Sequence, residues 1–295
     1  MTTSTSTERP GAAAVTATAA VPGHPGAPGG ARSGAAAARR LRGTGGRWRR
    51  AVTPLAILAG WEAASRAGVL PPTKLTAPSQ VLETGWRLAA DGSLGQHVLE
   101  SLTRAGIGLG IGAALGLALG ALAGLSRLGD DLIDPPLQMA RMLPHLALVP
   151  LLIIWIGIGE SVKVTLVALG AFFPIYLNTY AGIRDIDQRL VEAARSCGLS
   201  ALDRLRHVVL PGSLPSIFIG LRLAFGAGWL SLVVGEQVNA ERGIGFMIME
   251  ARDFSQTDIV VLGLVIYALL GLASDLILRS VERRALAWRR GLTAT

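Results

Sequence analysis

The amino-acid sequence predicts an all-α membrane protein with six transmembrane helices, and three observations lead to that fold class. Hydrophobic residues make up 51% of the 295 residues and charged residues only 16%, whereas a soluble domain carries about a quarter charged residues. The apolar residues gather in blocks of about 20, the length that crosses a bilayer as a helix. Arginines gather at the ends of alternate blocks, as they do in proteins that cross the membrane repeatedly.

The two ends of the chain differ from its middle. Residues 1–50 hold eight Arg against one Glu and are otherwise rich in Ala, Gly, Pro, Ser and Thr. Such a segment buries too little apolar surface to offset the entropy of ordering it, so we expect a disordered basic tail. This tail carries most of the net charge of +8, which leaves no basic face elsewhere for nucleic acid. We expect the transmembrane domain over residues 51–284 and a C-terminal tail over residues 285–295.

Turn signals and polar stretches separate the apolar blocks. Residues 130–136, with three Asp and two Pro, predict a short loop. An amphipathic helix is expected over residues 79–90, and a second amphipathic run that ends at Arg252 is expected at the outer face. The expected spans are residues 51–70, 102–125, 137–158, 161–183, 216–235 and 259–278.

The charge distribution predicts the orientation in the membrane. Six spans place both termini on one side, and the cytoplasmic side carries an excess of Arg and Lys. Both termini and the 184–215 loop are therefore expected in the cytoplasm. The side that holds them has six such residues in 39–50, one at 127, five in 184–215 and five in 279–290, against seven on the opposite side.

The second span is dominated by small residues. Gly108, Gly112, Gly116, Gly120 and Gly124 recur every four residues and follow one side of the helix. Stripes of small residues let two transmembrane helices approach closely, and close packing is the role that we expect here. A hinge within this span is the alternative.

Four polar residues lie within or beside the spans. Arg141, His145, Arg222 and Glu236 are candidates for lining a water-filled pathway, because ionisable groups at membrane depth usually face protein or water. Packing is the alternative for His145, and anchoring near the cytoplasmic boundary is the alternative for Arg141 and Arg222. No His, Cys or Glu lies at ligand spacing from His145, so no metal site is predicted.

Residues 184–215, the 184–215 loop, are polar and separate two spans. Apolar residues at helical spacing predict a first short helix, which Gly198 ends; Cys197, the one cysteine of the chain, lies on its apolar face. A second short helix is expected over residues 201–209. Pro211 and Pro215 are expected to break the chain before the next span. Two short helices that meet at a glycine form a compact projection, which is suited to a groove on another protein.

The same loop carries a recognisable motif. Glu192-Ala193-Ala194 is followed after three residues by Gly198, and after nine more by Val208-Val209-Leu210-Pro211. This pattern resembles the EAA loop of ABC-importer permeases, although that motif usually has Ile where this chain has Val208. The stretches MLPHLALVPLLIIWIGIGES, ALGAFFPIYLNTYAGIRDID and NAERGIGFMIMEARDFSQTD resemble the aliphatic-sulfonate permeases and their taurine and nitrate relatives. The resemblance covers residues 51–284.

The resemblance implies the type I ABC-importer permease fold in a bacterial plasma (inner) membrane. It also implies the partners: a second copy of the permease, an ABC ATPase that binds ATP and Mg, an extracytoplasmic solute-binding protein and the surrounding membrane lipid. The solute would be a small organic anion, with an aliphatic sulfonate first and taurine, nitrate or a thiamine-precursor pyrimidine as alternatives. The residues that would couple to the ATPase are Glu192, Ala193, Ala194, Gly198, Val208, Leu210 and Pro211.

Several motifs of other protein classes are missing. The sequence has no GxxxxGK[ST] loop to hold phosphates, so we expect neither ATP hydrolysis nor a cofactor in this chain. No Ser/His/Asp arrangement or metal cluster indicates an intramembrane enzyme. An ion-coupled secondary transporter is the alternative from another class; it would be expected to show inverted repeats, and we find no such symmetry in the sequence.

Overall fold

The computed structural model describes residues 45–71, 74–238 and 240–288. The chain forms two compact units, residues 1–56 and 57–295; of the first, only residues 45–56 are described, and they begin helix α2 (Gly45–Arg66). Most of the predicted basic tail and residues 289–295 of the predicted C-terminal tail lie outside the described residues. Residues 45–50 are helical, whereas we predicted disorder for them. The Trp and Arg residues of this segment are compatible with a helix, and α2 therefore begins before the apolar stretch.

Among the described residues every regular element is a helix, which confirms the predicted all-α class. The remaining α-helices in chain order are α3 (Pro78–Ala90), α4 (Ser93–Leu125), α5 (Arg127–Ala140), α6 (Val149–Ile156), α7 (Glu160–Arg184), α8 (Gln188–Ser196), α9 (Ala201–Arg204), α10 (Leu210–Gln237), α11 (Ile244–Asp253) and α12 (Thr257–Ala285). A 3-10 turn, η1 (His145–Leu148), precedes α6, and a π-helical turn, η2 (Leu205–Val209), joins α9 to α10. The amphipathic helix expected over residues 79–90 corresponds to α3, and the amphipathic run expected to end at Arg252 corresponds to α11.

Four helices are long and apolar enough to cross a membrane: α4, α7, α12 and the continuous helix Ala201–Gln237 that comprises α9, η2 and α10. The pair α5–α6 passes the same test only as one crossing with a bend of 79°. The predicted first span is not among these helices. Its apolar stretch in α2 lies between Arg50 and Glu62 and is shorter than the ~20 residues that a bilayer requires. By length and composition, the described residues therefore provide four or five spans rather than six.

The region after α4 differs most from the prediction. Residues 130–136, predicted as a loop, lie inside α5, because Ser126 caps this helix by accepting a hydrogen bond from the N–H of Gly129 (2.9 Å). The predicted third span is not one helix, since α5 ends at Ala140 and Pro144 precedes η1. Two aspartates of α5 accept hydrogen bonds from tyrosines of α7, Tyr180 to Asp130 (2.6 Å) and Tyr176 to Asp134 (2.9 Å).

The predicted chain break at Pro211 and Pro215 is also wrong. Helix α10 begins at Leu210, so Pro211 occupies its first turn. Proline is tolerated there, because the N–H groups of a first turn have no partner within the helix. Pro215 lies inside α10 without ending it. The second short helix expected over residues 201–209 is therefore the first part of the long helix Ala201–Gln237.

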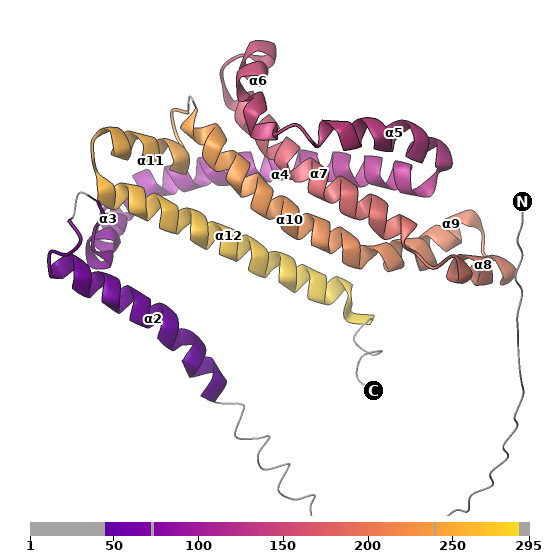
Figure 1. The fold of residues 1–295 in the computed structure, drawn as a ribbon, viewed down its shortest axis with the longest axis horizontal. Helices are drawn as coiled ribbons and strands as arrows, with labels where there is room; N and C mark the ends of the chain where they lie inside the picture. The colour runs from indigo at the N-terminus through magenta and orange to yellow at the C-terminus, as the bar shows by residue number, and fades with distance from the viewer. Residues whose placement is uncertain (1–44, 72–73, 239, 289–295) are drawn as a thin grey trace, which may run out of the picture. The chain divides into compact units, whose positions relative to one another are not determined.

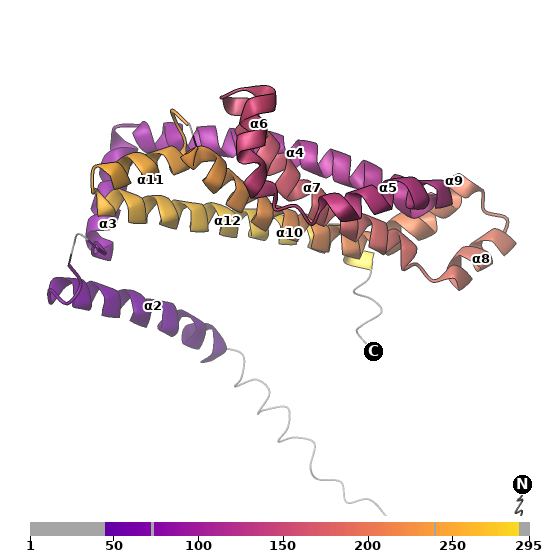
Figure 2. The same cartoon turned by 45° about the horizontal axis from the view of Figure 1, so that its top comes forward.

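The core of the unit formed by residues 57–295 is the packing of α4, α7 and α10, which lie side by side in Figures 1 and 2. The glycine stripe of α4 faces α7: a Cβ added at Gly116 would lie 2.9 Å from the carbonyl oxygen of Phe172, and one at Gly120 would lie 2.8 Å from that of Tyr176. On the other side of α7, a Cβ at Gly182 would lie 3.2 Å from the carbonyl oxygen of Ser213 in α10. The predicted close packing is confirmed, because these backbones approach as only glycine allows.

The packing predicts the effect of enlarging one glycine of the stripe. Gly116→Leu forces α4 away from α7, and overpacking of this kind costs about 1–3 kcal/mol; we expect the melting temperature in detergent to fall by several degrees. Gly110→Leu is the matched control on the same helix, because a Cβ at Gly110 would have no neighbour within 4 Å. Equal melting temperatures for the two variants would contradict the packing role.

Candidate functional site

The 184–215 loop contains the predicted short helix and turn. Helix α8 ends where Gly198 adopts a left-handed conformation (φ +80°), and the N–H of Leu199 donates to the carbonyl of Ala194 (3.1 Å), as in the glycine-based helix ends of many proteins. Ser200 then caps α9 by accepting a hydrogen bond from the N–H of Asp203 (3.2 Å). The predicted end of the first short helix at Gly198 is confirmed, and the loop is an ordered projection.

The projection has no buried core of its own. None of the residues of α8, α9 and η2 is buried, and Leu190 and Leu202 are 59% and 52% exposed. Cys197 is exposed as well. Of the predicted coupling residues, Glu192, Ala193, Gly198 and Leu210 are exposed, whereas Ala194, Val208 and Pro211 are half-buried. An exposed surface that mixes apolar and charged side chains is typical of a contact with another protein.

Two long helices carry the projection. On one side α7 leads into it, where Arg184 pairs with Asp130 of α5 (2.6 Å). On the other side α9, η2 and α10 are continuous, and Arg204 donates back to the carbonyl of Leu199 (2.8 Å). The projection is therefore joined directly to two of the central helices of the protein.

A cluster of polar and ionisable side chains lies at the opposite end of these helices, where Figure 1 shows α3 and α11. We call it the Glu236 cluster; its members are Ser101, Arg104, Glu160, Lys163, Glu236 and Tyr267. The side chain of Glu236 is fully buried. Its carboxylate accepts hydrogen bonds from Ser101 Oγ (2.7 Å), Arg104 Nη1 (2.8 Å) and Tyr267 Oη (2.8 Å). These donors come from α4 and α12, so the carboxylate joins three long helices.

Glu160 extends the cluster to α7. It binds Arg104 through Nε and Nη2 of the guanidinium and accepts a hydrogen bond from Lys163 Nζ (2.7 Å). The side chains of Arg104 and Lys163 are 5% and 3% exposed, whereas that of Glu160 is 59% exposed. Each buried charge has a partner of opposite sign, as expected where an unpaired buried charge would be costly.

The cluster also fixes the segment that precedes α11. Arg104 Nη1 donates to the carbonyl of Arg242 (2.6 Å), and the N–H groups of Ile244 and Gly245 donate to Ser101 Oγ (2.9 Å) and to Glu236 (2.8 Å). The first N–H groups of a helix lack partners within the helix. Ser101 and Glu236 supply those partners for α11 and hold it against the bundle.

Sequence reasoning singled out only Glu236 from this cluster. The sequence does contain a pattern that predicts the cluster: charged residues of both signs lie at the expected outer ends of three different spans. Opposite charges at one membrane depth are expected to pair. The members that were missed are Ser101, Arg104, Glu160, Lys163 and Tyr267.

The four candidate pathway residues are not brought together. His145 Nε2 lies 2.9 Å from Ser231 Oγ of α10, and Arg222 pairs with Glu282 (2.5 Å) of α12. Arg141 is exposed at the end of α5, and Glu236 is enclosed in its cluster. Within the part of the chain that the structure describes, no group of three metal-ligating side chains occurs.

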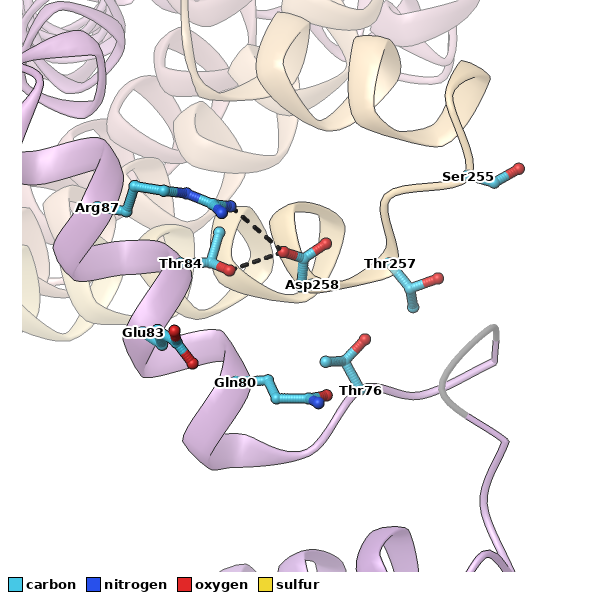
Figure 3. A pocket seen from close by; sticks show the side chains of 8 residues that line it. All are labelled: Thr76, Gln80, Glu83, Thr84, Arg87, Ser255, Thr257 and Asp258. Atoms are coloured by element: carbon cyan, nitrogen blue, oxygen red, sulfur yellow. Dashed lines mark hydrogen bonds and ion pairs between the residues drawn. The ribbon is translucent and has the colours of Figure 1, made fainter.

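A polar pocket of about 430 Å³ opens between α3 and the start of α12. Figure 3 shows Thr84 and Arg87 of α3 reaching toward Asp258; Thr84 Oγ1 donates to the carboxylate at 2.7 Å, and an Arg87 nitrogen lies 3.9 Å away. At the turn after α3, hydrogen bonds from Ser93 hold the pKa of the Asp91 carboxyl below its usual value. The bond to Asp258 holds α3 against the start of α12, and the bonds between Ser93 and Asp91 stabilise the turn between α3 and α4. The pocket is lined by Thr76, Gln80, Glu83, Thr84, Arg87, Ser255, Thr257 and Asp258.

Comparison with known sequences gives consistent matches. Residues 109–286 match the family described as "Binding-protein-dependent transport system inner membrane component". The "Putative aliphatic sulfonates transport permease protein" of Escherichia coli (strain K12) is 52% identical over 80% of this chain and 89% of its own length. A protein of the same name from Bacillus subtilis (strain 168) is 42% identical over 80% and 86%. The taurine transport system permease protein of Escherichia coli (strain K12) is 36% identical over 79% and 86%.

Two solved structures share the fold. A chain of the methionine ABC transporter in an inward-facing conformation matches with a TM-score of 0.50 and 21% identity, over 63% of this chain and 94% of that one. A chain of an amino acid ABC transporter matches with a TM-score of 0.54 and 19% identity, over 64% and 92%. At identities this low, the two matches show a shared fold and nothing more.

The Glu236 cluster predicts the effect of removing its central cation. Arg104→Ala leaves the buried carboxylate of Glu236 without its cation, while Glu160 keeps Lys163; breaking a buried ion pair costs about 3–5 kcal/mol. We expect a lower melting temperature in detergent and faster tryptic cleavage after Arg242. Arg252→Ala is the control, because that side chain is 66% exposed. Arg104→Ala with wild-type melting and cleavage would show that the cluster does not hold α11.

Proposed function

Because the chain belongs to the family of inner membrane components of binding-protein-dependent transport systems, we infer that it forms the import pathway for an aliphatic sulfonate. The chain is a permease subunit of an ABC importer, embedded in the membrane by its apolar helices. The observation that supports the substrate most strongly is the 52% identity over 80% of the chain to a protein named for aliphatic sulfonates. The relative named for taurine, itself a sulfonate, is 36% identical.

Two kinds of partner complete the proposed importer. An ATPase subunit binds ATP and Mg and contacts the 184–215 loop, whose exposed apolar side chains and ordered turn suit a groove on that subunit. An extracytoplasmic solute-binding protein delivers the sulfonate at the opposite end, near α3 and α11. We propose two copies of the permease in the complex, with the pathway formed between or within them.

Transport then requires that nucleotide and solute favour different states of the same helices. ATP closes the ATPase dimer and draws the two 184–215 loops together. Because α7 and α10 carry each loop, closure of the ATPase dimer is transmitted to the helices that cross the membrane. Release of the products after hydrolysis returns the loops and opens the pathway inward.

The substrate assignment predicts which solute couples to ATP hydrolysis. In liposomes that contain the permease, its ATPase and its solute-binding protein, pentanesulfonate should stimulate ATP hydrolysis several-fold, and nitrate or a thiamine-precursor pyrimidine should not. Gly198→Val should lower this stimulation toward the basal rate, because a β-branched residue strains the left-handed turn by about 1–3 kcal/mol. Gly198→Asn is the matched control, since Asn tolerates that conformation. Stimulation by nitrate but not by pentanesulfonate would overturn the substrate, and full stimulation of Gly198→Val would overturn the coupling role.

We also propose that the protein lies in the bacterial inner membrane with both termini and the 184–215 loop in the cytoplasm. Cys197, the one cysteine and an exposed one, reports on this orientation. A membrane-impermeant maleimide should not label it in cells whose outer envelope alone is permeable. Inverted vesicles should be labelled readily without the ATPase and more slowly with it. Labelling from outside would reverse the orientation.

A further inference from the structure

The helix pair α5–α6 is broken within the depth of the bundle. Helix α5 starts at the end that carries the 184–215 loop and runs back along α4, bonded to two tyrosines of α7. Arg141 follows its fourteen residues, or about 20 Å of helix. Past the break, His145 bonds to Ser231, which is fully buried inside α10. Figures 1 and 2 show α6 turned away from the direction of α5, in agreement with the 79° bend. Residues 141–144 therefore lie between the ends of the spans.

At this break the backbone N–H groups of residues 141–143 donate to carbonyls of α5, but three carbonyls lack backbone partners in the part of the chain described by the structure. Among the described residues, the carbonyls of Arg141, Met142 and Leu143 accept no backbone hydrogen bond. All three residues are exposed, Met142 at 69% and Leu143 at 57%. Unpaired carbonyls are not stable against hydrocarbon, and irregular backbone at membrane depth occurs where it lies against protein or water. The break therefore needs water or a protein surface beside it.

Arg141 differs from the other cations within the spans. Arg104 and Lys163 pair with carboxylates in the Glu236 cluster, and Arg222 pairs with Glu282 (2.5 Å) and with Asp275 (3.5 Å). In the described part of the chain, Arg141 has no carboxylate within 4.0 Å. A guanidinium at this depth is costly unless it is hydrated, and an unpaired one is available for the oxygens of an anion.

We propose that the solute pathway passes the break between α5 and α6, and that Arg141 binds the sulfonate group there during transport. This rests on the proposed function, which makes the solute an anion. The unpaired carbonyls keep the passage hydrated, and Arg141 supplies the positive charge that draws the sulfonate into it. His145 is a positioning residue, because its bond to Ser231 holds the far side of the break against α10.

The first test asks whether water reaches the break. In a Cys197→Ser background, Leu143→Cys and Leu269→Cys are matched positions, with native side chains 57% and 58% exposed; Leu269 lies in the unbroken helix α12. The reagent is (2-sulfonatoethyl) methanethiosulfonate, a charged thiol reagent that is itself an ethanesulfonate, applied to the complete importer in liposomes. We expect labelling of Leu143→Cys at least about tenfold faster than that of Leu269→Cys, and slower labelling when pentanesulfonate is present. Equal rates would mean that lipid or a second copy covers the break, and would overturn the pathway.

The second test concerns Arg141 itself. Arg141→Gln should lower the pentanesulfonate imported per ATP hydrolysed by about tenfold and abolish the protection of Leu143→Cys by pentanesulfonate. Arg141→Lys should restore part of both, because the charge remains. Arg127→Gln is the control, an exposed arginine at the start of the same helix. Equal results for Arg141→Gln and Arg127→Gln would overturn the role of Arg141. If the wild type imports no pentanesulfonate, the substrate assignment fails, while the labelling rates still decide whether the break is hydrated.

Discussion

The pairing of Arg104 with Glu236 is the interaction on which the outer end of this structure depends. A carboxylate buried at the end of α10 needs hydrogen-bond donors, and α4 and α12 supply them from Ser101, Arg104 and Tyr267. The Glu236 carboxylate also accepts the N–H of Gly245, and Ser101 Oγ accepts that of Ile244, at the start of α11. The Arg104–Glu236 pair and its neighbours thus hold the outer ends of α4, α10 and α12 together, and they hold the short helix α11 against these ends.

The middle of the bundle is held in another way. Apolar association gains little in lipid, so α4, α7 and α10 are held by the contact that their glycines allow. The stripe on α4 and Gly182 on α7 bring backbones to within van der Waals distance. Close contact of this kind leaves little room for independent sliding, which is why the 184–215 loop at one end and the Glu236 cluster at the other belong to a single mechanical unit.

Much of this could be predicted from the sequence, and the exceptions have physical causes. The spans at α7, α10 and α12, the glycine packing and the turn at Gly198 followed from hydrophobic length, small-residue spacing and helix-end chemistry. The Arg104–Glu236 pair could not be chosen by pattern alone, since its members are 132 residues apart. Helix α5 was read as a loop because Asp and Pro are common in turns, yet its Ser126 cap and the tyrosines of α7 stabilise it as a helix. The predicted first span does not pass the test of length and composition, because Arg50 and Glu62 limit the apolar stretch of α2.

The continuity of α9, η2 and α10 gives the protein a lever arm. A helix of 37 residues is about 55 Å long, so a tilt of a few degrees about its anchored outer end displaces the opposite tip by several ångströms. The regular hydrogen-bond ladder is interrupted near that tip, by the π turn at residues 205–209 and by Pro211 and Pro215, which lack an N–H. Because these interruptions lie toward one end of the helix, a small displacement of the tip can be taken up locally, and a larger one is passed along the rest of the helix. The transmembrane helices would then respond to a large displacement of the 184–215 loop by its partner and not to small thermal fluctuations of that loop.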